Sequence, residues 1–253
     1  MRAYELMKET FFRRRYIAIV HGTWLAFYAL FWWLFLPDPE EYGRFLLTWG
    51  GFILPLALSA GILGDDIASG RICVLVTKPF WPGELYVYRL AGLSLQAGAH
   101  FLLAALLVFV LHIATRRGDA SGTGPWLFAS WLLFNTVAAL STSVSVVVKR
   151  ANNSLLLLVT ILTGAVVAQI LISNLSGHAL GTVVAGFFRY PFPPFELLHH
   201  LAKGDYARES LSLGSWRIPM SVACVGHSLV LTALYAGAGV LLLTRRQFSA
   251  PRD

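Results

Sequence analysis

Six long hydrophobic runs constrain the fold of this 253-residue chain more than any other feature of its sequence. An α-helix rises about 1.5 Å per residue, so about 20 apolar residues cross a hydrocarbon core of about 30 Å. The runs occupy residues 16–36, 45–63, 90–113, 126–148, 154–175 and 219–243. They are continuous rather than alternating, which favours helices. The sequence therefore predicts an all-α membrane protein with six transmembrane helices in one domain, residues 1–253.

Composition and charge support this assignment and predict an orientation. Hydrophobic residues make up 57% of the chain and charged residues 13%, against about 25% charged in soluble domains. With both termini on one side of the membrane, 13 of the 20 Lys and Arg residues lie on that side. Because basic residues in short loops stay inside, both termini are predicted to be cytoplasmic, in the cell (inner or plasma) membrane. No basic aromatic module or zinc pattern occurs, so membrane lipids and not nucleic acid are the expected partners of this charge.

The residues before the first run predict an interfacial helix. On a helix, Tyr4, Met7, Phe11 and Phe12 share one face at spacings of three or four, with basic residues between them. Such a helix lies along the cytoplasmic surface of the bilayer. The alternative is a basic flank that only orients the first span.

A polar segment after the second run, residues 64–89, carries the clearest functional signal. Its residues of interest are Asp65, Asp66, Gly70, Arg71, Leu75, Lys78, Pro79 and Arg89. The segment lies on the cytoplasmic side, is interrupted by Pro79 and Pro82, and ends on an aromatic cluster that includes Tyr86. Exposed aromatic residues suit a partner's groove or the lipid headgroups, and both alternatives stay open.

These features resemble the permeases of ABC-2 type transporters. In that family an acidic residue, a short gap, Gly-Thr, a Leu-rich stretch, a Pro and a basic residue follow the second of six spans. This chain has Asp66 where Glu is frequent and Arg71 where Thr is usual. The resemblance implies that segment 64–89 is a coupling element seated in a cytoplasmic ABC ATPase subunit. It also implies a dimer with a second permease subunit, identical or different, that encloses the substrate path.

The chain has no nucleotide site of its own in its sequence. The phosphate-binding pattern Gly-x-x-x-x-Gly-Lys-Ser/Thr does not occur. We therefore expect no cofactor on this chain, no catalytic residues and no enzyme activity, and we expect ATP and Mg in the partner ATPase. The spans have no Asp or Glu at their centres, which weighs against coupling to protons or sodium ions.

Polar side chains inside the spans predict contacts between helices. The candidates are Gln96, His100, Asn135, Gln169 and His227. Hydrogen bonding between helices is the first interpretation, and metal or haem ligation is the alternative. Pairs of small residues four apart, such as Ala233 and Gly237, predict close helix approach. Cys73 and Cys224 lie in different regions, so neither a disulfide nor a metal site is expected.

The outer segment between the last two spans, residues 176–218, is rich in proline around position 192. Its sequence predicts a short helix over residues 197–201 and a turn at residues 203–205. We expect the segment to pack against the outer face of the membrane domain or to re-enter the membrane. The first outer connection, with Asp38, Glu40 and Glu41, is predicted to be a short acidic loop.

The leading hypothesis is thus the permease subunit of an exporter for a lipid-like, peptide or drug-like substrate. The main alternative is a polytopic membrane scaffold or assembly protein without transport activity. An intramembrane enzyme is the third, although no Gly-x-Ser-x-Gly or His-Glu-x-x-His pattern occurs.

Overall fold

The computed structural model describes residues 2–12, 17–34, 38–70, 81–116, 122–148, 192–213 and 216–245, with single helical residues at 156, 159 and 163. The elements in chain order are α1 (Arg2–Phe12), α2 (Ile17–Leu34), α3 (Pro39–Leu46), the π-helix η1 (Leu47–Ile53), α4 (Leu54–Ser59), α5 (Gly64–Ala68), α7 (Pro82–Thr115), α8 (Thr123–Val147), α11 (Phe195–Lys203), β1 (Ser210–Leu213), β2 (Trp216–Pro219) and α12 (Met220–Arg245).

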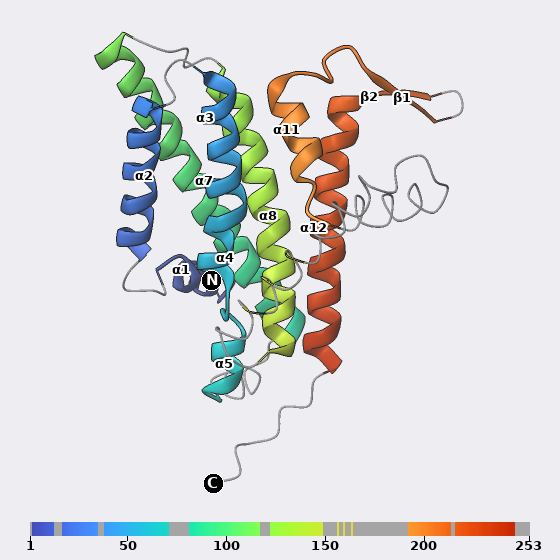
Figure 1. Ribbon diagram of the computed structural model, residues 1–253. Coiled ribbons are helices and arrows are strands. Elements are labelled where there is room, and N and C mark those ends of the chain that lie inside the picture. The colour runs from blue at the N-terminus through green and yellow to red at the C-terminus, as the bar shows by residue number, and fades with distance from the viewer. Residues whose placement is uncertain are drawn as a thin grey trace.

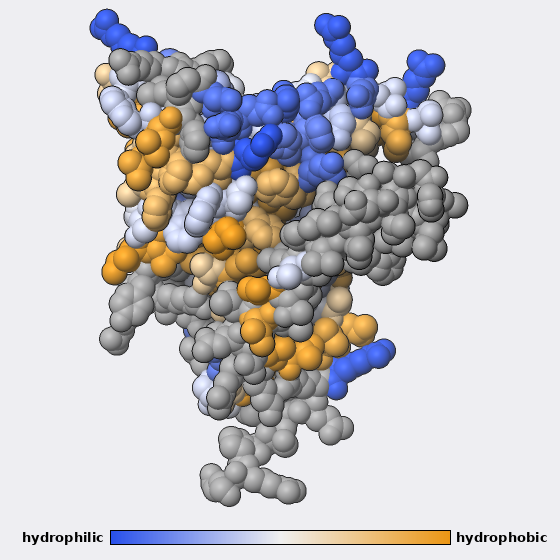
Figure 2. All heavy atoms as spheres, in the orientation of Figure 1, coloured by the Kyte–Doolittle hydropathy of each residue, from blue (hydrophilic) through white to orange (hydrophobic). Residues whose placement is uncertain are grey.

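Four helical stretches in this described part are long and apolar enough to cross a membrane. They are Pro39–Ala68, Pro82–Thr115, Thr123–Val147 and Met220–Arg245. Each contains or closely matches one predicted run, and the shorter apolar helix Ala18–Leu34 lies within another. Figure 2 shows hydrophilic residues gathered over the upper ends of α3 and α11 and mostly hydrophobic residues on the flanks below. The helical, membrane-type character is confirmed, while most of the fifth predicted span, residues 154–175, lies outside the described residues.

Three sequence predictions are wrong in detail. Residues 82–89 are not a loop but the first turns of α7, because Pro82 occupies the first helical turn, where its missing N–H costs nothing. The acidic connection is the start of α3, where the Asp38 carboxylate accepts hydrogen bonds from the N–H groups of Glu40 (2.9 Å) and Glu41 (3.1 Å). The chain is also not wholly helical, because β1 and β2 form an antiparallel hairpin before α12.

The outer helix and its turn agree with the prediction. α11 ends at Gly204, whose φ of 86° is a left-handed conformation that glycine adopts without strain. The N–H of Gly204 donates to the carbonyl of His200 (3.2 Å) and so closes the last turn.

The packing centres on α8, which contacts α3, η1, α4, α7, α11 and α12. Leu132, Leu133 and Phe134 of α8 are almost fully buried. α7 and α12 instead expose apolar side chains, including Leu102 and Leu234, as expected for helices that meet lipid. Figure 1 shows α8 and α12 side by side with α7 tilted against them, α1 at the foot of α2, and α5 at the lower end.

One glycine allows α12 to approach α7 closely. A Cβ atom on Gly239 would lie 2.3 Å from the ring of Tyr86, whose hydroxyl is 2.8 Å from the Ser143 hydroxyl of α8. Gly237, the glycine that the small-residue pattern selects, has no described atom within 4 Å of a Cβ position. Gly239 is therefore the glycine that packs against α7, and close approach at Gly237 stays a prediction, since no described residue contacts it.

Candidate functional site

A buried ion pair joins the start of α7 to the segment after the second run. The side chains of Asp66 in α5 and Arg89 in α7 are both fully buried, and Arg89 Nη2 lies 3.3 Å from Asp66 Oδ2. A charge removed from water is costly unless it is paired and hydrogen-bonded. Each of these two residues therefore depends on the other for its place in the fold.

Arg89 also reaches the N-terminal helix. Its Nη1 donates to the Thr10 hydroxyl (3.0 Å), and its Nη2 lies 3.4 Å from Glu9 Oε1. Gly92, one turn further along α7, makes room for α1, because a Cβ there would lie 2.7 Å from the Cβ of Thr10 and 3.0 Å from the Met7 carbonyl oxygen. We call Glu9, Thr10, Asp66 and Arg89 the arginine junction. It ties α1, α5 and α7 together through one guanidinium group.

Asp65 and Asp66 have opposite environments although they are adjacent in the sequence. Asp66 is buried in the arginine junction, whereas Asp65 is exposed. α5 ends two residues later, and Gly70 follows with a φ of 69°. The first carboxylate is thus free to meet another molecule, while the second is committed to the fold.

The structure brings together only part of the predicted coupling segment. It places Asp66 against Arg89, whereas Asp65 lies on the exposed side of α5 and Gly70 follows the end of that helix. Four further predicted residues lie outside the described residues: Arg71, Leu75, Lys78 and Pro79. Glu9 and Thr10 were not predicted, although an arginine at the end of a polar segment requires acceptors, and the N-terminal helix supplies them.

A helix, α1, forms where the sequence predicts an interfacial helix, and its faces can be assigned in part, while its location at a membrane surface stays a prediction. Tyr4 is exposed and Met7 is half-buried, while the side chains of Phe11 and Phe12 lie outside the described part. Thr10, which the apolar pattern ignores, is buried against α7. The polar edge of α1 therefore docks on the protein, and Tyr4 points away from it.

A second polar cluster links α2 to α7 along their apolar lengths. Gln96 Nε2 lies 2.7 Å from His21 Nε2, His21 Nδ1 lies 3.0 Å from His100 Nδ1, and His100 Nε2 lies 3.2 Å from the Tyr28 hydroxyl. Because an amide nitrogen only donates, His21 Nε2 accepts and its Nδ1–H donates to His100. Gln96 and His100 thus make hydrogen bonds between helices, as the first interpretation of the sequence expects.

Of the remaining intramembrane candidates, the structure places Asn135 in α8 and His227 in α12. Asn135 donates to the Trp131 carbonyl of its own helix (2.7 Å), His227 lies in α12, and Gln169 is outside the described residues. Within the described part of the chain, no group of three or more His, Cys, Asp or Glu side chains could hold a metal ion. Cys224 is a buried free thiol, and Cys73 is outside the described residues.

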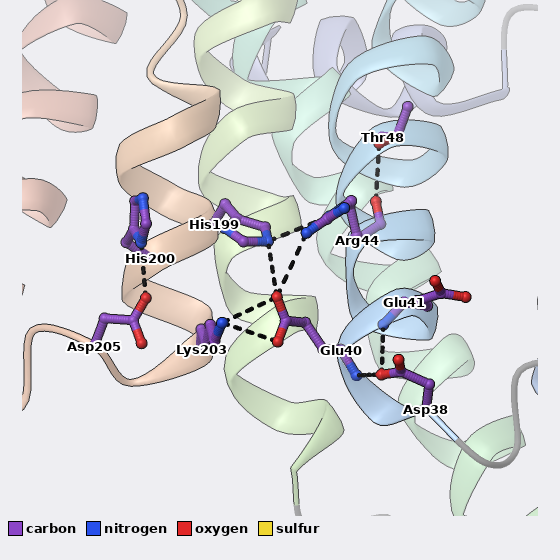
Figure 3. A network of polar contacts seen from close by, with 9 residues as sticks. All are labelled: Asp38, Glu40, Glu41, Arg44, Thr48, His199, His200, Lys203 and Asp205. Atoms are coloured by element: carbon purple, nitrogen blue, oxygen red, sulfur yellow. Dashed lines mark hydrogen bonds and ion pairs between the residues drawn. The ribbon is translucent and has the colours of Figure 1, made fainter.

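A third cluster, the outer network, connects α3 to α11 and is drawn in Figure 3. Lys203 Nζ lies 2.9 Å from Glu40 Oε2, and Arg44 Nη2 lies 3.4 Å from Glu40 Oε1. Arg44 Nε donates to His199 Nε2 (3.4 Å), and the His200 ring lies 2.7 Å from Asp205 Oδ2. The outer segment is thereby fixed to the start of α3, which precedes it by more than 150 residues.

Electrostatics in the outer network follow from these contacts. Burial, reinforced by the neighbouring Arg44 charge, lowers the pKa of His199 and favours its neutral imidazole. The hydrogen bond to Glu40 raises the pKa of Lys203, and the hydrogen bond from His200 lowers the pKa of Asp205. At neutral pH the network therefore contains an ionised Lys203 and Asp205 beside an uncharged His199.

In each of the three clusters, polar side chains from different helices contact one another. Guanidinium, carboxylate, amide and hydroxyl groups here bind one another across helix boundaries, and they satisfy groups that would be costly to bury alone. No protein-family model matches this chain, and no curated protein is significantly similar to it.

Proposed function

We propose that this chain is the transmembrane permease subunit of an ABC-2 type transporter, with six spans, both termini in the cytoplasm and a separate ATPase that supplies the energy. The observation that carries the proposal is the arginine junction. Arg89 connects two elements to the first turns of a 34-residue helix. One is α5, which belongs to the segment that the resemblance assigns to contact with the ATPase, and the other is the N-terminal helix α1 beside it.

The two neighbouring carboxylates suggest how force passes through this region. Exposed Asp65 is available to a cytoplasmic partner, and Asp66 on the same short helix is fixed to Arg89 of α7. A displacement of α5 by the partner acts on α7 through a buried ion pair that resists separation. α7 is about 51 Å long at about 1.5 Å per residue, so it carries that displacement across the whole bilayer.

The substrate path forms between two such subunits in this proposal, and the substrate is lipid-like, peptide or drug-like. ATP and Mg bind only to the partner ATPase. A scaffold without transport would use the same partner surface but would not require the buried connection between α5 and α7.

The test uses a photo-crosslinking residue at position 65 in the full chain, in its native membrane. A matched probe at Glu41 serves as the control, since this exposed residue lies at the other end of the helical stretch Pro39–Ala68. We expect the probe at Asp65, and not the probe at Glu41, to capture a protein that carries a phosphate-binding loop and hydrolyses ATP. We also expect Asp65→Lys to weaken the association about tenfold, equivalent to about 1.4 kcal/mol.

Two results would refute the proposal. The first is modification of a cysteine at position 65 by a membrane-impermeant reagent added outside the cell. The second is a captured partner that lacks nucleotide hydrolysis, which would favour the scaffold.

A further inference from the structure

The hairpin that precedes α12 has two chemically different faces. Leu211 pairs directly with Ile218, and Ser212 pairs with Arg217. Residues opposite one another in an antiparallel pair point to the same face, and faces alternate along each strand. One face therefore carries Leu211, Ile218 and Trp216, and the other carries Ser212 and Arg217.

The apolar face of the hairpin is open among the described residues. The side chains of Trp216 and Leu211 are 74% and 44% exposed, and Ile218 is half-buried. An isolated two-stranded hairpin is marginally stable in water, and a sheet needs a layer against its apolar face. A cover for this face must therefore come from its surroundings.

The position of the hairpin indicates what that cover is. β2 runs directly into α12, one of the helices long enough to cross a membrane, and Met220 N–H donates to the Glu209 carbonyl (2.9 Å). This bond continues the ladder of β1 and β2 to the first residue of the helix. Figure 1 shows the strands extending sideways from the end of α12, across the direction of the helices. A membrane crossed by α12 would therefore have the hairpin at the level of its surface and along its plane.

The residue types match that level of the bilayer. Tryptophan is enriched where the hydrocarbon meets the headgroups, because its ring is apolar while its N–H seeks water or phosphate. Arg217, on the opposite face, is exposed and can reach phosphate or water. If a soluble partner covered the apolar face, the hairpin would have no need to lead directly into a helix long enough to cross a membrane.

We propose that the hairpin β1–β2 is a membrane-interface anchor, which inserts the face of Leu211, Trp216 and Ile218 into the headgroup region and keeps Ser212 and Arg217 in water. It holds the outer end of α12 at a fixed depth. This inference rests only on the membrane-spanning nature of α12, so it stands or fails independently of the transporter assignment.

The test is a nitroxide scan of the hairpin in the full chain, reconstituted in phosphatidylcholine–phosphatidylglycerol nanodiscs. The background variant replaces Cys73 with serine and Cys224 with alanine. Single cysteines are introduced at Leu211, Trp216 and Ile218 for one face, and at Ser210, Ser212 and Arg217 for the other. Collision rates with oxygen, which enters lipid, and with a nickel chelate, which stays in water, are measured at each site.

We expect a period of two along the strands. Labels at Leu211, Trp216 and Ile218 should collide more with oxygen than with nickel, and labels at Ser212 and Arg217 should show the reverse order. Circular dichroism and elution volume check that each variant is folded.

Two outcomes would overturn the anchor. Nickel access on both faces would place the hairpin in water. Loss of both oxygen and nickel access on the apolar face would mean that protein, and not lipid, covers it.

Discussion

Replacing Asp66 with asparagine removes the only fully buried carboxylate of the arginine junction and should destabilise the protein strongly. Breaking a buried ion pair by removing one partner costs about 3–5 kcal/mol, because the other charge stays buried. Glu9 remains 3.4 Å from the guanidinium, but it is partly exposed and screened by solvent. We therefore expect the lower end of that range, about 3 kcal/mol of unfolding free energy for Asp66→Asn.

The adjacent residue provides the control for this prediction. Asp65→Asn makes the same chemical change at an exposed position, and it should alter the unfolding free energy by no more than about 0.5 kcal/mol. Reversible unfolding in mixed micelles of mild detergent and sodium dodecyl sulfate measures both values. The double variant Asp66→Asn/Arg89→Gln should cost about 2 kcal/mol less than the sum of the two single changes, because the two side chains interact directly.

Equal costs for Asp65→Asn and Asp66→Asn would refute this reasoning. So would strict additivity in the cycle with Arg89→Gln, because it would mean that the two side chains do not stabilise one another.

Two further perturbations test other contacts. Gly239→Ala should lower the free energy of unfolding by about 1–3 kcal/mol, because the new methyl group meets the Tyr86 ring. The control Gly237→Ala should change it by less than about 0.5 kcal/mol in the same assay. Equal effects of the two changes would contradict the packing of α12 on α7. The pKa of His199 is lowered in the folded state, so its contribution to stability is complete above the ordinary value of 6.5 and is lost as pH falls through the lower folded pKa. The rate of hydrogen exchange in α11, corrected for the intrinsic rate, should therefore increase in the natural chain as the pH is lowered from 7.5 to 5. The increase should be absent in His199→Gln. The same pH dependence in that variant would exclude the imidazole as the cause.

The long helices were predictable because their signal is local. A continuous apolar run of about 20 residues needs no knowledge of the rest of the chain. The turn at Gly204 was predictable for the same reason, since Lys-Gly-Asp after a short apolar stretch marks a helix end. The start of α7 was not predictable in the same way, because proline suits a first helical turn as well as a loop. α7 begins at Pro82, eight residues before its apolar run.

The sites depend on pairings across long stretches of chain, which residue types alone do not reveal. Asp66 and Arg89 were both selected from the motif, but the motif does not say that they meet or that Thr10 completes the site. Lys203 and Glu40 are 163 residues apart, and no periodic pattern connects them. The hairpin was missed because Ser-Leu-Ser-Leu is short, although its alternation is the pattern of a half-buried strand.

The arginine junction also bears on the order in which the chain folds during translation. Among the described residues, the carboxylates of Glu9 and Asp66 face Arg89, and both leave the ribosome before it does, since Asp66 precedes Arg89 by 23 residues. Until the guanidinium emerges, Asp66 lacks its Arg89 partner, and burying its charge costs more. The region of the first two hydrophobic runs is therefore expected to reach its final packing only after Arg89, in the next helix, has been translated.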